Sequence, residues 1–92
     1  MKVICEGIII GESDDVVALG RECYFPLNAV NMDVLMPSSE PLYCPDKGYG
    51  ENYDIVTPGG LVRGSAWAYP HPYPDALALK GRIGFKATMV SE

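Results

Sequence analysis

The side chains best suited to chemistry in this chain are concentrated in two short segments, 43–53 and 66–70. They hold the only tryptophan, four of the six tyrosines and one of the three cysteines. Within and beside them, Cys44 is a candidate nucleophile, and the single histidine, His71, is the candidate general base that would activate it. A free cysteine flanked by tyrosine and proline is more often a small buried apolar residue, so the sequence leaves open whether the protein is an enzyme.

The loop Pro45–Gly50 combines a lysine with glycines, which suits it to binding an anion. Backbone N–H groups in such a loop can surround an anionic group, and Lys47 would add a positive point charge. The loop is not a P-loop, because the Gly-x-x-x-x-Gly-Lys spacing and the following serine or threonine are absent. The alternative is an ordinary tight turn whose lysine extends into water.

A strand expected after Gly60 carries most of the remaining candidates. The period of two in a strand places its aromatic and polar side chains on one face and its small residues on the other. Side chains that join apolar area to a polar tip or a charge are typical of ligand pockets, and they also occur in protein cores. We therefore expect a pocket for a small polar or anionic ligand, lined by Lys47, Tyr53, Arg63, Trp67 and Tyr69.

No metal ion or cofactor is expected. The three cysteines and His71 could supply four zinc ligands, but the chain has no Cys-x-x-Cys pair, and structural zinc sites usually contain such close-spaced ligands. Paired carboxylates beside a Gly-Ser loop, which Mg²⁺-dependent phosphoryl transfer would need, are also missing.

The composition is that of an ordinary globular chain, with 48% hydrophobic and 21% charged residues. Its 92 residues predict one small domain spanning 1–92. The seven basic residues are scattered and the net charge is −5, which argues against a nucleic-acid partner, because binding to a phosphate backbone requires clustered lysine and arginine.

The expected compartment is the cytoplasm, without a membrane partner. No stretch approaches the ~20 apolar residues of a membrane-spanning helix. Glu6 and Gly7 interrupt the first apolar run before it reaches the length of a signal peptide. Thiols stay reduced in the cytoplasm, so we expect Cys44 to be a mostly buried thiol that forms no disulfide with Cys5 or Cys23.

Glycine and proline divide the chain into short segments rich in β-branched and aromatic residues, which is typical of a β-rich domain. Short strands are expected before residue 26, where Glu6-Gly7 is predicted to be a tight turn between the first two. A further strand is expected at 82–85, extended by Thr88–Val90. The clearest signal is the turn Thr57–Gly60. Its proline suits the first central turn position and the following glycine suits a positive φ at the second. It predicts a hairpin formed by residues 51–56 and 61–67.

Residues 26–41 are expected to be largely irregular. Asn28 and Asp33 could each cap a single helical turn, because asparagine and aspartate are favoured N-caps. Pro37–Pro41 is predicted to be a loop, since proline cannot continue a helix and is common in turns. Pro74–Lys80 is predicted to be a short helix, with proline at its start and a glycine just past its end.

Several short motifs follow one another in a specific order over nearly the whole chain: Tyr24-Phe25-Pro26, Pro37-Ser38, Cys44-Pro45-x-Lys47-Gly48, Tyr53, Ala66-Trp67-x-Tyr69-Pro70-x-Pro72 and Lys80-Gly81-x-Ile83-x-Phe85. As a set they resemble the domain of unknown function 427, a mostly bacterial family that also carries a nucleotidyltransferase-like label. The resemblance implies a mainly β fold of compact antiparallel sheets of short strands, β-tent-like, with one or two short helices. Some β-tent relatives carry a zinc knuckle, whose cysteine pairs this chain lacks.

These observations favour a small non-catalytic binding module whose ligand is small and polar or anionic. Two alternatives remain open from the sequence. One is a small hydrolase or transferase that uses Cys44 with His71. The other is a structural or oligomerising domain whose exposed aromatic side chains form a dimer face, so that the protein is either a monomer or a homodimer.

Overall fold

The computed structural model describes residues 1–92 and consists of short strands joined by turns and 3₁₀ helices. The strands are β1 (Lys2–Cys5), β2 (Ile8–Glu12), β3 (Val17–Leu19), β4 (Glu22–Pro26), β5 (Leu35–Cys44), β6 (Gly48–Thr57), β7 (Gly60–Ala68), β8 (Arg82–Lys86) and β9 (Val90–Ser91). The 3₁₀ helices are η1 (Leu27–Ala29), η2 (Met32–Val34), η3 (Pro74–Leu79) and η4 (Ala87–Met89). None of these helical segments has the length and apolar character that crossing a bilayer requires.

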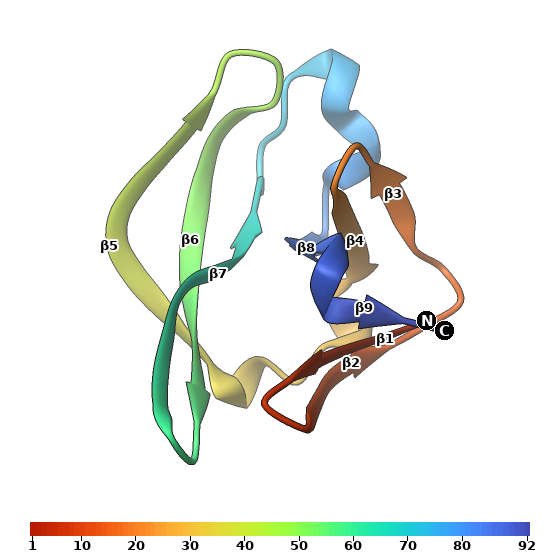
Figure 1. The fold of residues 1–92 in the computed structure, drawn as a ribbon. Coiled ribbons are helices and arrows are strands. Elements are labelled where there is room, and N and C mark those ends of the chain that lie inside the picture. Colours follow the sequence, from red (N-terminus) through yellow and green to blue (C-terminus); the bar gives the residue numbers. More distant parts are fainter.

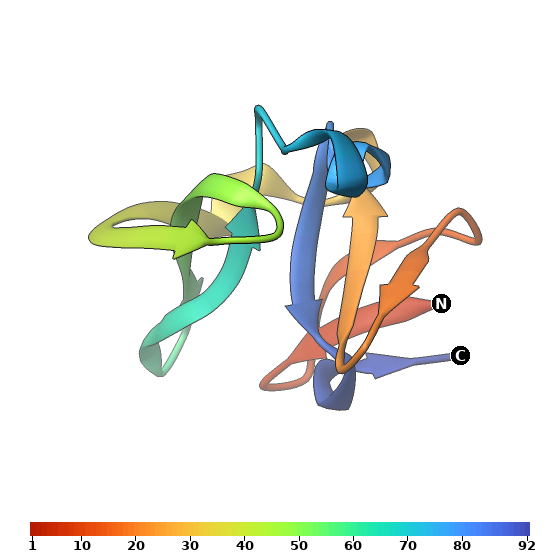
Figure 2. The same ribbon diagram turned by 90° about the horizontal axis from the view of Figure 1, so that it is seen from above.

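The strands form two antiparallel sheets, which confirms the predicted mainly β class. The smaller sheet has the order β2-β1-β9 and the larger one the order β3-β4-β8-β7-β6-β5. Figure 1 shows the long strands β5, β6 and β7 curving away from the smaller sheet, in which β1 and β9 bring the two ends of the chain together. Seen from above in Figure 2, the β5–β6 hairpin lies at one end of the molecule and the smaller sheet at the other.

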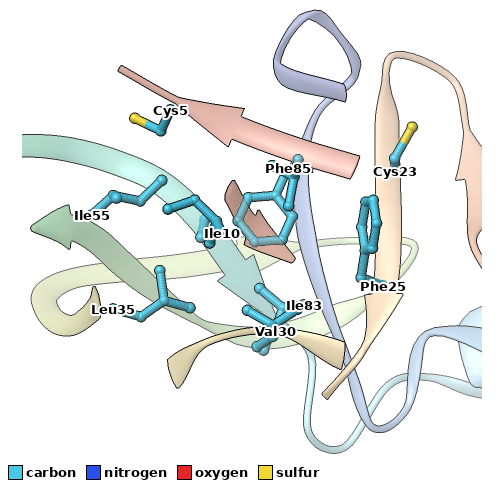
Figure 3. Close-up of a cluster of buried hydrophobic side chains, with 12 residues drawn as sticks. Cys5, Ile10, Cys23, Phe25, Val30, Leu35, Ile55, Ile83 and Phe85 are labelled. Carbon is cyan, nitrogen blue, oxygen red and sulfur yellow. The ribbon is translucent and has the colours of Figure 1, made fainter. Parts of the chain in front are cut away.

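The main core lies between the two sheets. Phe25 and Phe85 pack edge to face, with ring centroids 5.9 Å apart and an interplanar angle of 83°, and both side chains are fully buried. Ile10 and Cys5 reach the same cluster from the smaller sheet (Figure 3). An isolated bridge pairs Gly11 of β2 with Val30, which lies between η1 and η2 and also packs in this core.

Two predicted turns are confirmed. Glu6 and Gly7 both have positive φ and close the β1–β2 hairpin. Thr57 pairs with Gly60, so Pro58 and Gly59 form the two-residue turn between β6 and β7. The positive φ falls on Gly60 (125°) rather than on Gly59, and the hydroxyl of Thr57 donates a hydrogen bond to the carbonyl of Gly60 at 2.9 Å.

The loop predicted at Pro37–Pro41 is wrong. These residues belong to β5, which pairs with β6 on both sides of an irregularity: Pro37 lies opposite Tyr53 and Pro41 opposite Glu51. The prolines are tolerated because β5 is the edge strand of the larger sheet, where a missing backbone N–H does not interrupt a second ladder. The extra residues between the prolines bulge out of the strand.

Other expectations differ in detail. Asn28 lies inside η1, and Asn31, not Asp33, caps η2 by accepting a hydrogen bond from the N–H of Asp33. The predicted helix after residue 73 is the 3₁₀ segment η3, kinked at Ala76. The expected extension of the strand at 82–85 by Thr88–Val90 is wrong: the chain turns through η4, and Val90 pairs with β1 in the smaller sheet.

Candidate functional site

A row of residues crosses the face of the larger sheet that points away from the main core. Tyr24 on β4 pairs with Gly84 on β8, Gly84 pairs with Trp67 on β7, and Trp67 pairs with Asn52 on β6. Because alternate residues of a strand point to opposite faces, Phe25 and Phe85 enter the main core, whereas Tyr24 and Trp67 form a second cluster on the other side.

Gly84 provides the space in which the indole of Trp67 lies. A Cβ atom at position 84 would be 2.5 Å from Nε1 of Trp67 and 2.6 Å from a ring carbon of Tyr24. The two aromatic side chains therefore meet across the bare backbone of β8. The tyrosine hydroxyl accepts a hydrogen bond of 3.0 Å from the indole N–H, which gives the buried polar tip of tryptophan its partner.

The hydrogen bond from Trp67 continues into a chain of polar contacts. Tyr24 donates its hydroxyl proton to Oε1 of Glu22 at 2.7 Å. Burial, together with this hydrogen bond to the Glu22 carboxylate, raises the pKa of Tyr24 far above its usual range, so its hydroxyl remains a donor at physiological pH.

Lys47 completes the chain from the tip of the β5–β6 hairpin. Its Nζ lies 3.8 Å from Oε1 of Glu22, 3.8 Å from Sγ of Cys44 and 5.9 Å from the centroid of the Tyr69 ring. The lysine side chain is only 19% exposed. The turn that carries it is a tight turn, closed by the N–H of Lys47 on the carbonyl of Cys44, and the charge is directed back onto the sheet rather than into water.

Cys44 and His71, the catalytic candidates, have different surroundings. Cys44 is partly buried, and all three cysteines are free thiols. The polar side-chain partner of Cys44 is Lys47. His71 is exposed, and its imidazole forms no hydrogen bond or ion pair with Cys44 or any other residue of the chain. No group of three or more His, Cys, Asp or Glu side chains is close enough to hold a metal ion.

Arg63 is separated from the aromatic residues by a bulge in β7. Tyr53 pairs with Ala66 and Ile55 with Val62, so β7 has extra residues between these two pairs. Gly64 adopts a positive φ there, and its N–H donates to the carboxylate of Asp54 at 2.8 Å. Arg63 therefore borders a separate polar hollow of about 690 Å³, which Asn52, Asp54 and the bulge of β5 also line.

Tyr53 and Tyr69 lie on opposite faces of the larger sheet. Tyr53 packs against the main core, and Tyr69 belongs to the second cluster, where η3 covers it. Both border a small hollow of about 220 Å³ where β7 and β8 separate. Burial raises the pKa of both tyrosines, with smaller contributions from Glu51 for Tyr53 and from Cys44 and Glu22 for Tyr69. Of the five predicted ligand-binding residues, the structure thus brings Lys47, Trp67 and Tyr69 together.

A third hollow, of about 440 Å³, opens beside Trp67. It is lined by Arg21, Glu22, Trp67, Lys86, Ala87 and Thr88. Arg21 and Lys86 take part in no ion pair. Sequence reasoning missed both cations because they belong to a turn and to a strand end remote from Trp67. The signal that could have found Lys86 is the alternation of side chains along strand 82–86, which places Lys86 on the same face as Gly84.

Together, the fold and this region define a small antiparallel β domain. A hydrogen-bonded chain leads in it from buried Trp67 and Tyr24 to partly exposed Glu22 and Lys47, beside a hollow on the surface. Residues 1–92 match a family described as a domain of unknown function (DUF427), and the chain belongs to that family. None of the curated proteins matches the chain.

Replacing Tyr24 by phenylalanine is expected to lower the free energy of unfolding by about 2 kcal/mol, because the buried N–H of Trp67 loses its acceptor. Urea unfolding followed by tryptophan fluorescence measures this. Tyr53→Phe is the matched control, since the Tyr53 hydroxyl forms no hydrogen bond, and a change within about 0.5 kcal/mol is expected. Equal losses for the two variants would contradict the role of the hydrogen bond.

The difference in stability between the wild type and Tyr24→Phe is also expected to depend on pH. The raised pKa of Tyr24 means that the folded protein holds the phenol proton more tightly than the unfolded chain does. This contribution to stability is complete below the usual tyrosine pKa of about 10 and is lost as the pH rises towards the folded-state pKa. The stability advantage of the wild type over Tyr24→Phe should therefore be larger at about pH 8 than at about pH 10.5. An advantage that stays constant would contradict the assignment.

Proposed function

We propose that this protein is a small, cytoplasmic, non-catalytic binding module whose ligand is a small anion bound in the hollow beside Trp67. The observation that carries the proposal is the pairing of an aromatic floor with two cations that have no ion-pair partner, Arg21 and Lys86. A positive rim around an apolar surface is the arrangement that fixes a small charged ligand by its charge and its flat or apolar part.

The carboxylate of Glu22 is the one negative group that lines this hollow, and its charge is already balanced. Tyr24 donates a hydrogen bond to it, and Lys47 places its ammonium 3.8 Å away. Lys47 does not line the hollow, and its role is to neutralise the charge of Glu22. Arg21 and Lys86 supply the positive charge that a ligand would contact. This division of roles modifies the expectation that Lys47 itself contacts the ligand.

The only tryptophan of the chain lies in the proposed site, so its fluorescence reports on binding without a label. Titration with inorganic pyrophosphate and with citrate is expected to change the Trp67 emission saturably. Arg21→Gln and Lys86→Gln should each weaken binding by about tenfold, which corresponds to about 1.4 kcal/mol. Both variants should fold normally, because exposed charges contribute little to stability.

Two variants control for the loss of one positive charge. Lys80→Gln removes an exposed lysine that has no ion-pair partner and does not line the hollow, and Arg63→Gln removes the arginine of the separate polar hollow. Neither should change the affinity beyond the small effect of net charge. Weakening by Arg63→Gln instead of Lys86→Gln would move the site to the other hollow, and absence of any saturable change would refute the proposal.

A further inference from the structure

We propose that Cys44 and Lys47 form a peroxide-sensitive modification site, in which oxidised Cys44 condenses with the Lys47 amine to give a sulfur–nitrogen bond. The site is the pair of side chains, not the cysteine alone. It is independent of the binding function proposed above, because it requires no ligand in the hollow beside Trp67.

The hairpin turn places the two reacting atoms together. Cys44 pairs with Gly48, so only the three residues 45–47 separate the strands, and Sγ of Cys44 lies 3.8 Å from Nζ of Lys47. The backbone of Lys47 is held on both sides: its N–H donates to the carbonyl of Cys44 at 3.2 Å, and its carbonyl accepts from the N–H of Tyr73 at 2.9 Å. Reacting groups that are held close to each other react far faster than free ones.

The amine is also held from the side of the sheet. Glu22 attracts the ammonium, and the ring of Tyr69 faces it at 5.9 Å. These contacts reduce the number of positions open to a long, flexible lysine side chain and keep its nitrogen near sulfur. An ordinary surface lysine has no such restraint and spends its time in water.

The other two cysteines lack both accessibility and an amine partner. Cys5 and Cys23 are buried in the main core, where Figure 3 shows them among aliphatic and aromatic side chains. Cys44 is partly exposed at the edge of the second cluster, which makes it the most accessible of the three cysteines to a small dissolved oxidant. Oxidation should therefore be selective for Cys44, since susceptibility follows exposure.

The chemistry has two balanced steps. Hydrogen peroxide transfers one oxygen atom to the sulfur, R–SH + H₂O₂ → R–SOH + H₂O, so that sulfur loses two electrons and peroxide gains them. Lys47 then loses a proton to water, and its free amine attacks the sulfur, R–SOH + R′–NH₂ → R–S–NH–R′ + H₂O. The S–O bond breaks as the S–N bond forms. An added dithiol would reverse the product by reducing the S–N bond to thiol and amine.

Formation of the S–N bond would also change the hydrogen-bonded chain that leads from Lys47 to Trp67. The S–N product is neutral at position 47, so Glu22 would lose its cation while it still accepts the hydrogen bond from Tyr24. The Tyr24 hydroxyl in turn accepts a hydrogen bond from the indole N–H of Trp67. Trp67 emission is therefore expected to change on oxidation in the absence of any ligand.

The test treats the whole protein with dilute hydrogen peroxide and follows it by mass spectrometry, peptide mapping and fluorescence. The expected product weighs two hydrogen atoms less than the reduced chain, is no longer alkylated at Cys44, and is not cleaved by trypsin after Lys47. Dithiothreitol should restore the mass, the alkylation and the cleavage.

Lys47→Arg and Cys44→Ser are the matched variants. Lys47→Arg keeps the positive charge beside Glu22 but removes the amine, so Cys44 should retain added oxygen and trypsin should still cleave after position 47. Cys44→Ser should show none of these changes. A wild-type product that carries only added oxygen at Cys44, a disulfide between two chains, or the same product in Lys47→Arg would overturn the proposal.

Discussion

Replacing Gly84 by alanine should lower the free energy of unfolding by about 3 kcal/mol, at the upper end of the usual cost of overpacking. The new Cβ would lie 2.5 Å from Nε1 of Trp67 and 2.6 Å from a ring carbon of Tyr24, and both rings belong to the buried second cluster. Neither can withdraw without breaking the 3.0 Å hydrogen bond between them. Urea unfolding measures the loss, and a red shift of the Trp67 emission should accompany it.

Gly59→Ala is the control for this variant. Its Cβ would make ordinary contacts with the flexible end of Glu6 at 3.4 Å and the hydroxyl of Thr57 at 3.9 Å, and Gly59 does not adopt a positive φ. Alanine there should be neutral or should raise stability by about 0.4–1 kcal/mol, because it restricts the unfolded chain. If Gly84→Ala were equally well tolerated, the close packing of Trp67 on β8 would be wrong.

Replacing Phe25 by alanine should cost about 4 kcal/mol of unfolding free energy. The ring is fully buried and packs edge to face on Phe85 between the two sheets, so its removal leaves a cavity that rigid strands on both sides cannot fill. For a small domain, which is stable by only about 5–15 kcal/mol, this is a large share. Calorimetry or urea unfolding should show a strongly lowered midpoint.

Leu77→Ala is the comparison for the loss of a large apolar side chain outside the core. Leu77 is 61% exposed on η3, so its truncation should change stability by no more than about 0.5 kcal/mol. Similar losses for Leu77→Ala and Phe25→Ala would mean that the space between the sheets is not the main source of stability.

The two faces of the larger sheet carry different kinds of side chain. One face meets the smaller sheet and holds the aliphatic and phenylalanine core. The other face carries Trp67, Tyr24 and Tyr69 together with charged residues, and η3 covers only part of it. No buried side-chain nitrogen or oxygen atom lacks a hydrogen-bond partner, and the indole N–H of Trp67 is satisfied by the polar chain that ends at Lys47. Arg21 and Lys86, at the edge of this face, form no ion pair.

Local sequence signals predicted the turns and most of the strands. Glu6-Gly7 and Pro58-Gly59 each reverse the chain within two residues. Such turns depend on local sequence, because glycine at or next to the turn can adopt the positive φ that they require. The runs rich in β-branched and aromatic residues became strands for the same local reason. The mainly β class and the family could therefore be inferred from the order of the residues alone.

Expectations failed where the outcome depended on a distant partner. Pro37–Pro41 looks like a loop by itself, and only pairing with β6 at the sheet edge makes it part of a strand. Strict alternation placed Arg63 beside Trp67, but the bulge at Gly64 separates them, and its hydrogen bond to Asp54 comes from another strand. Val90 does not extend β8, because it pairs instead with the edge of β1, which comes from the other end of the chain.

The amino-acid sequence by itself determined the turns, the strand-forming segments, the absence of a zinc-type cysteine pattern and the aromatic, lysine-containing character of the candidate region. The tertiary structure decided which of those residues meet. Tyr24 and Trp67 are 43 residues apart, and they touch only because β8 lies between their strands and has glycine at the crossing point. Periodicity assigns a residue to a face of its own strand, whereas strand order and bulges, which arise from long-range packing, decide its neighbours.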